Sequence, residues 1–85
     1  MNNDIDNLKK KILYRSTYRG TKEMDMLLHK FVKYYIDELD SKDLYDLHEL
    51  LKIEDEILFN FYQFGKKNES LQENRISSLF KNFKI

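Results

Sequence analysis

Residues 24–39, MDMLLHKFVKYYIDEL, carry the strongest helical pattern in the chain. Apolar residues recur there at spacings of three and four, which places them on one face of a helix. The members of this stripe are Met24, Leu27, Leu28, Phe31, Val32, Tyr35, Ile36 and Leu39. Because the stripe is unbroken, we expect this helix to be the central element of the hydrophobic core.

Four other segments carry weaker helical patterns. We predict helices over residues 3–16, 21–39, 41–52, 54–64 and 70–82. Asp40 is a suitable N-cap for the third helix, Gly65 suits the left-handed end of the fourth, and Ser70 with Glu73 predicts a capping box for the fifth. With no proline and two glycines among 85 residues, the sequence predicts an all-α fold, a small five-helix bundle in which residues 1–85 form a single domain.

The fourth predicted helix includes the aromatic run ILFNFYQF, residues 57–64. A helix that is apolar on nearly all sides is buried or forms an interface. The rings could also stack on a base or a flavin. Because so small a domain needs large side chains in its core, we expect these aromatic rings to pack inside.

Composition and charge limit the classes of partner. Fifteen basic residues balance fifteen acidic ones, so we expect neither nucleic acid nor a membrane as partner. We also expect a monomer when the protein is free. The chain has no cysteine, and no apolar run approaches the roughly 18 residues of a membrane-spanning helix. The first residues, MNNDIDNLKKK, resemble neither a signal peptide nor a transit peptide. We therefore expect a cytoplasmic, bacterial-type location.

Chemistry-bearing residues are few. His29 and His48 are the two histidines, and neither belongs to a spacing typical of metal ligands. The sequence also lacks glycine-rich phosphate-binding loops and the GxSxG nucleophile motif. We therefore expect no enzymatic activity, no metal site and no tightly bound cofactor.

The segment STYRGTKEMDMLL, residues 16–28, combines Arg19, Gly20 and Glu23 at the corner before the second predicted helix. If this helix begins near Thr21, Gly20 is an acceptable N-cap and Glu23 occupies the N3 position. A guanidinium close to a helix N-terminus meets an unfavourable dipole, so we expect Arg19 to point outward. We expect the Glu23 carboxylate to point outward with it, from the rim of the buried face. Together the three residues could form a polar docking point for another protein, or the glycine could simply make a turn.

A basic cluster lies on the first predicted helix, at Lys9, Lys10, Lys11 and Arg15. A solvated helix face explains it, since no aromatic residues are interleaved with the charges. The alternative is a small helical adaptor or regulator that binds nucleic acid through this helix.

Two segments together resemble the flavinator (SdhE) family, the small FAD assembly factors of succinate dehydrogenase. YRGTKEMDMLL, residues 18–28, matches the family's RGxxE motif in its longer form RGxxExD, and LLKIEDEILFNF, residues 50–61, is similar to a later family segment. Glu56 stands where the family often has proline, and Phe61 where it often has tryptophan. The last fifteen or so residues show no recognisable similarity.

This resemblance implies a non-enzymatic, chaperone-like assembly factor. Such a factor binds the flavoprotein subunit of succinate dehydrogenase, with the related fumarate reductase as a second candidate, and promotes covalent attachment of FAD to a histidine of that subunit. The resemblance assigns partner binding to Arg19, Gly20 and Glu23, with Tyr18 and Asp25 at the edge of the site. It implies that the factor acts on FAD held by its partner.

Overall fold

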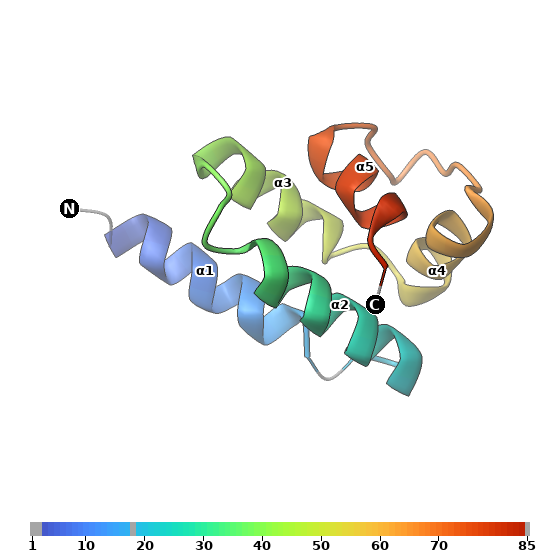
Figure 1. Cartoon of the computed structure of the whole chain (residues 1–85), viewed down its shortest axis with the longest axis horizontal. Helices are drawn as coiled ribbons and strands as arrows, with labels where there is room; N and C mark the ends of the chain where they lie inside the picture. The colour runs from blue at the N-terminus through green and yellow to red at the C-terminus, as the bar shows by residue number, and fades with distance from the viewer. Residues whose placement is uncertain (1–2, 18, 85) are drawn as a thin grey trace.

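The computed structural model describes residues 3–17 and 19–84 and contains five α-helices (Figure 1). They are α1 (Asn3–Arg15), α2 (Lys22–Tyr35), α3 (Ser41–Leu50), α4 (Asp55–Phe64) and α5 (Arg75–Asn82). The described residues include no strand. The Cα radius of gyration is 12.1 Å, close to the roughly 12 Å of a compact domain of this length. The predicted all-α bundle is confirmed.

The helices pack in a connected series. α1 and α2 run in opposite directions along one side of the molecule (Figure 1), and α1 also packs against α3. α5 packs against α3 and α4. The corner between α1 and α2 and the N-terminus of α4 are the parts of the fold that position the candidate site.

The apolar stripe of α2 forms the centre of the core, as predicted. Met24, Leu27, Leu28, Phe31, Val32, Ile36 and Leu39 are buried, and Tyr35 is half-buried. The ring of Phe31 lies edge-on to that of Phe80, with centroids 5.4 Å apart, so α2 and α5 are joined by aromatic packing. The helix ends at Tyr35, before the predicted residue 39, and residues 36–38 form a turn. Ile36 and Leu39 nevertheless stay buried in the core.

The expectation that the α4 aromatics all pack inside was wrong for two rings. Leu58 and Phe61 are buried, but Phe59 is 38% exposed and Phe64 is 72% exposed. The Phe59 and Phe64 rings meet edge-to-face with centroids 6.5 Å apart. A ten-residue helix has one inner face, and these two side chains lie outside it.

Of the helix ends predicted for α3, α4 and α5, two are confirmed. Asp40 caps α3 by accepting a 2.9 Å hydrogen bond from the Asp43 amide, and Gly65 ends α4 with φ 67°. The start of the fifth helix was predicted wrongly. α5 begins at Arg75 because Asn74 forms a capping box with Ser77. The Ser70 amide instead donates to the Asn68 side chain.

Candidate partner-binding site

The side chain of Arg19 points into the molecule, so the expectation that it points outward was wrong. Its Nε donates to Oδ1 of Asp55 at 2.7 Å. The guanidinium also donates to three main-chain carbonyls, those of Arg15, Leu51 and Ile53, at 3.1, 2.7 and 3.0 Å. The side chain is 12% exposed. These partners outweigh the helix dipole, because Asp55 carries a full negative charge and the end of a helix only about half a positive one.

Gly20 binds the other oxygen of the same carboxylate. Its amide donates to Oδ2 of Asp55 at 2.7 Å. The Asp55 carboxylate is therefore hydrogen-bonded by two groups of the α1–α2 corner, the Arg19 side chain and the Gly20 amide. A Cβ at position 20 would lie 3.2 Å from Oδ2 of Asp55. The glycine is therefore explained by the close approach of Asp55, and we call these three residues, Arg19, Gly20 and Asp55, the corner clamp.

The first turn of α2 also differs from the prediction. Thr21, not Gly20, is the N-cap, and its side chain accepts a 3.2 Å hydrogen bond from the Met24 amide. Glu23 is consequently the second helical residue rather than the third, and it is exposed. The expectation of an outward-pointing carboxylate is therefore confirmed for Glu23.

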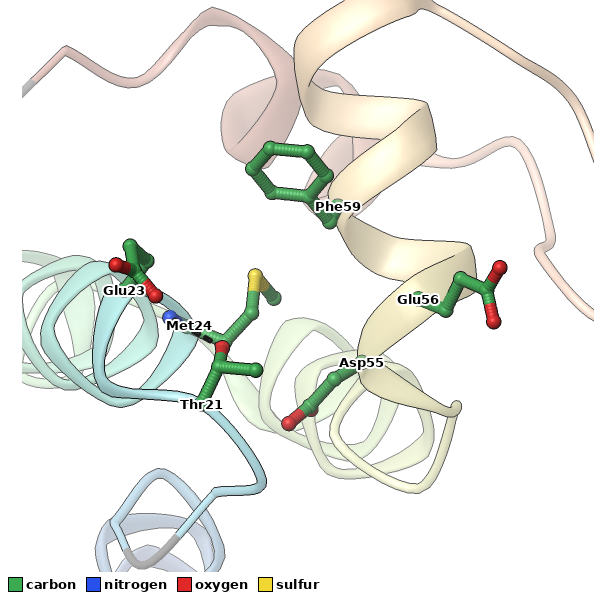
Figure 2. Close-up of a pocket in the computed structure, with 6 residues that line it drawn as sticks. All are labelled: Thr21, Glu23, Met24, Asp55, Glu56 and Phe59. Atoms are coloured by element: carbon green, nitrogen blue, oxygen red, sulfur yellow. Dashed lines mark hydrogen bonds between the residues drawn. The ribbon is translucent and has the colours of Figure 1, made fainter.

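An open pocket of about 370 Å³ lies between the N-terminal turns of α2 and α4, and we call it the corner pocket. Figure 2 shows that Met24 directs its sulfur atom toward the space between the two helices, with the Phe59 ring above it. The carboxylate of Glu56 points away from α2. The residues that line the pocket are Thr21, Glu23, Met24, Asp55, Glu56 and Phe59.

The remaining predicted site residues lie apart from this pocket. Asp25 is half-buried and borders a different hollow on α2, together with Thr17, Met26 and His29. Tyr18 lies outside the described residues. The structure therefore brings Glu23 to the pocket and bonds Arg19 and Gly20 to Asp55 in its lining, but it leaves Asp25 at a different hollow of α2.

The two histidines lie on different helices, His29 on α2 and His48 on α3. Nδ1 of His29 and Nε2 of His48 are buried without a hydrogen-bond partner among these residues. Burial lowers the pKa of His48, and the charges of Lys52 and Arg15 add to this effect. No cluster of three metal-ligating side chains occurs in the described part of the chain.

The corner clamp joins the two segments that carry the sequence resemblance, because Arg19 and Gly20 come from the first and Asp55 from the second. A family model described as flavinator of succinate dehydrogenase matches residues 10–84. The chain belongs to this family. The match extends to residue 84, so the expectation that the last fifteen residues lack similarity to it was wrong.

A curated relative supports this membership. The chain is 40% identical over 58 residues to a protein of Dictyostelium discoideum named "Succinate dehydrogenase assembly factor 2, mitochondrial". The aligned region is 68% of this chain and 41% of the relative, so the chain spans less than half of that protein. No solved structure matches the chain.

Membership of the flavinator family leaves the cellular location as a prediction. The relative's name assigns that protein to mitochondria, whereas the cytoplasm was expected for this chain. Within the described residues, none of the helices is long and apolar enough to cross a membrane.

The two departures from the family pattern fit the structure. Glu56 is the second residue of α4, and its amide is one of those that lack a partner within the helix. Proline, which has no N–H, is tolerated in a first helical turn for the same reason. Phe61 is buried in the core, so an aromatic ring is retained where tryptophan is common.

Sequence reasoning missed the part of the site that α4 contributes. Asp55 belongs to the acidic pair of the second family segment, so its presence was visible but its contact with Arg19 was not. Phe59 was assigned to the core because periodicity cannot separate an inner from an outer aromatic on an all-apolar helix. Thr21 could have been considered as an N-cap beside Gly20, since threonine and glycine are about equally favoured at that position.

Proposed function

We propose that this chain is an assembly factor that binds the flavoprotein subunit of succinate dehydrogenase and promotes covalent attachment of FAD to it. The family match over residues 10–84 carries the proposal. The name of the Dictyostelium discoideum relative agrees with it. The meeting of the two family segments at the corner clamp also supports it, since family-typical residues there build one local structure.

The proposed mechanism is conformational. The chain would hold the domains of the flavoprotein so that the partner's histidine faces the methyl carbon of the flavin. Correct orientation can lower a reaction barrier by several kcal/mol without a chemical group from the factor. The flavin and its histidine then carry out the chemistry.

The structure leads us to divide the roles within the RGxxE motif. Glu23 is exposed beside the corner pocket and is proposed to contact the partner directly. Arg19 is proposed to act from inside, by fixing the N-terminus of α4 against the corner. Gly20 serves the clamp through its amide, and its exposed outer side leaves room for a partner backbone.

Asp25 is proposed to lie at the edge of the contact, on the far flank of α2, and the same role is kept for Tyr18 as a prediction from the motif. Such an extended contact fits a protein–protein interface, in which a few central residues contribute most of the binding energy and a polar rim surrounds them.

A reconstitution assay tests the proposal. Purified chain is mixed with the apo flavoprotein subunit of succinate dehydrogenase and FAD, and covalent flavin is measured as fluorescence that survives denaturation and electrophoresis. We expect the chain to accelerate its appearance. A rate equal to that without the chain, under conditions in which the flavoprotein is folded, would contradict the proposal. The same assay with the fumarate reductase flavoprotein tests the second candidate partner.

A further inference from the structure

The corner pocket has an apolar interior. Met24, which is 2% exposed, forms its floor, and Phe59, which is 38% exposed, forms a wall that continues onto the outer face of α4. Methionine adapts to differently shaped neighbours because its side chain is flexible and polarizable. At about 370 Å³ the pocket is at the small end of the ligand-pocket range, which suits one large side chain better than a cofactor.

The margins of the pocket are acidic. Glu23 on α2 and Glu56 on α4 both line it, and the Glu56 carboxylate is directed away from α2 (Figure 2). Both residues are exposed, and neither carboxylate forms an ion pair within residues 3–17 and 19–84. The third carboxylate, that of Asp55, is already matched by the guanidinium of Arg19.

The helix ends reduce this negative charge without cancelling it. Each N-terminus contributes roughly half a positive charge, so two termini offset about one of the two free carboxylates. Lys22, the first residue of α2, is exposed but does not line the pocket. A net negative margin around an apolar interior therefore remains.

We propose that the corner pocket receives one large apolar side chain from the flavoprotein subunit, within a segment that carries lysine or arginine on both sides of that residue. The apolar side chain would pack on Met24 and Phe59. One flanking cation would face Glu23 on α2, and the other would pass over α4 to reach the Glu56 carboxylate, which points away from α2. This inference rests on the proposed function and adds the chemistry of the partner segment.

Affinity measurements on the full chain test the apolar contact. The purified flavoprotein subunit is titrated with the wild type, with Phe59→Ala and with Phe59→Leu. Loss of a central aromatic contact typically weakens binding about thirtyfold. We expect that loss for Phe59→Ala and recovery of most of the affinity for Phe59→Leu. Tyr45→Ala, which removes an exposed ring on α3, is the matched control and should bind as the wild type does.

Salt dependence tests the charged contacts. The double variant Glu23→Gln/Glu56→Gln should bind about fivefold to tenfold more weakly at low ionic strength and lose part of the salt dependence of the wild type. The control Glu38→Gln/Glu69→Gln removes two exposed carboxylates elsewhere and should leave affinity nearly unchanged. Circular dichroism verifies that each variant is folded.

A crosslinking experiment identifies the occupant. Phe59→p-benzoyl-phenylalanine is irradiated in the complex, and the attached flavoprotein peptide is sequenced by mass spectrometry. We expect a peptide with an apolar residue between lysines or arginines. An acidic or uncharged peptide, or a crosslink to a second copy of this chain, would overturn the inference.

The outcomes separate the two proposals. If the wild type does not bind the flavoprotein, both the proposed function and this inference fail. If the wild type binds and accelerates flavin attachment while the pocket variants bind equally well, the inference is overturned and the proposed function stands.

Discussion

Arg19 and Asp55, which are 36 residues apart in the chain, are joined by a 2.7 Å hydrogen bond between Nε and Oδ1. The contact connects the α1–α2 corner to the first residue of α4. Since the guanidinium also bonds the carbonyls of Leu51 and Ile53, it fixes the loop that precedes α4 as well. One side chain thus sets the relation between the two helix ends that form the corner pocket.

A double-mutant cycle measures this contact. Arg19→Ala and Asp55→Ala should each lower the free energy of unfolding by about 2–3 kcal/mol, because each leaves partly buried charged or polar groups without partners. The double variant should be less destabilised than the sum, with a coupling energy of about 1–2 kcal/mol. Urea unfolding followed by circular dichroism gives all three values, and Lys22→Ala serves as an exposed control. Strictly additive losses would show that the two residues act independently.

Substitutions at Gly20 should depend on Asp55. In the wild type, Gly20→Ala should lower stability by about 1 kcal/mol, because the new Cβ would lie 3.2 Å from Oδ2 of a carboxylate whose other oxygen, Oδ1, is held by Arg19. In the Asp55→Ala background this oxygen is absent. The same substitution should there be neutral or stabilising by up to about 1 kcal/mol, since alanine restricts the unfolded chain. Equal effects in both backgrounds would show that Asp55 is not the reason for a glycine at position 20.

Below about pH 6.5, the ordinary pKa of histidine, the free energy of unfolding should decrease as the pH is lowered. His48 is the expected source of this decrease. Burial lowers the pKa of this imidazole in the folded state, so the unfolded chain takes up the proton first. The stability contributed by the neutral imidazole of His48 is fully present above its ordinary pKa. It is lost as the pH falls toward the lower pKa of the folded state.

The measurement uses the His29→Gln variant, in which His48 is the one histidine of the chain. Its free energy of unfolding is determined from pH 7.5 downward, and His48→Gln is then added. We expect the second substitution to flatten the slope just below pH 6.5. An unchanged slope would exclude His48 as its source.

Capping of α5 provides a matched pair of stability tests. Asn74→Ala should cost about 1 kcal/mol, because it removes the acceptor for the Ser77 amide and breaks the capping box. Ser70→Ala should change stability by less than about 0.5 kcal/mol, since its hydroxyl does not cap this helix. Thermal unfolding of both variants measures the two losses. A larger loss for Ser70→Ala than for Asn74→Ala would support the helix start at residue 70 that was predicted from the sequence.

The elements of the fold could be read from the sequence because they depend on local patterns. The α2 stripe repeats at helical spacing from Met24 to Leu39, and Asp40 and Gly65 are residue types with strong positional preferences at helix ends. The fifth helix began later than expected because Ser70 and Asn74 are both good caps. Sequence spacing alone does not decide between two such candidates.

The site was harder to predict because it depends on contacts between distant segments. The direction of Arg19 was inferred from the nearest helix dipole, a weak field compared with the full charge of Asp55. No local pattern shows that these residues meet. Glu23 was placed correctly because its exposure follows from its position beside the stripe on α2 itself.

Proton exchange at the Nε–H of Arg19 tests most directly whether this residue acts from inside the molecule. In nitrogen-15 NMR spectra of the free protein, this proton should exchange with water much more slowly than that of the exposed Arg15, and Asp55→Asn should accelerate it. If Arg19 exchanges as fast as Arg15, and Asp55→Asn has no effect, the guanidinium faces solvent and the corner clamp does not exist in solution.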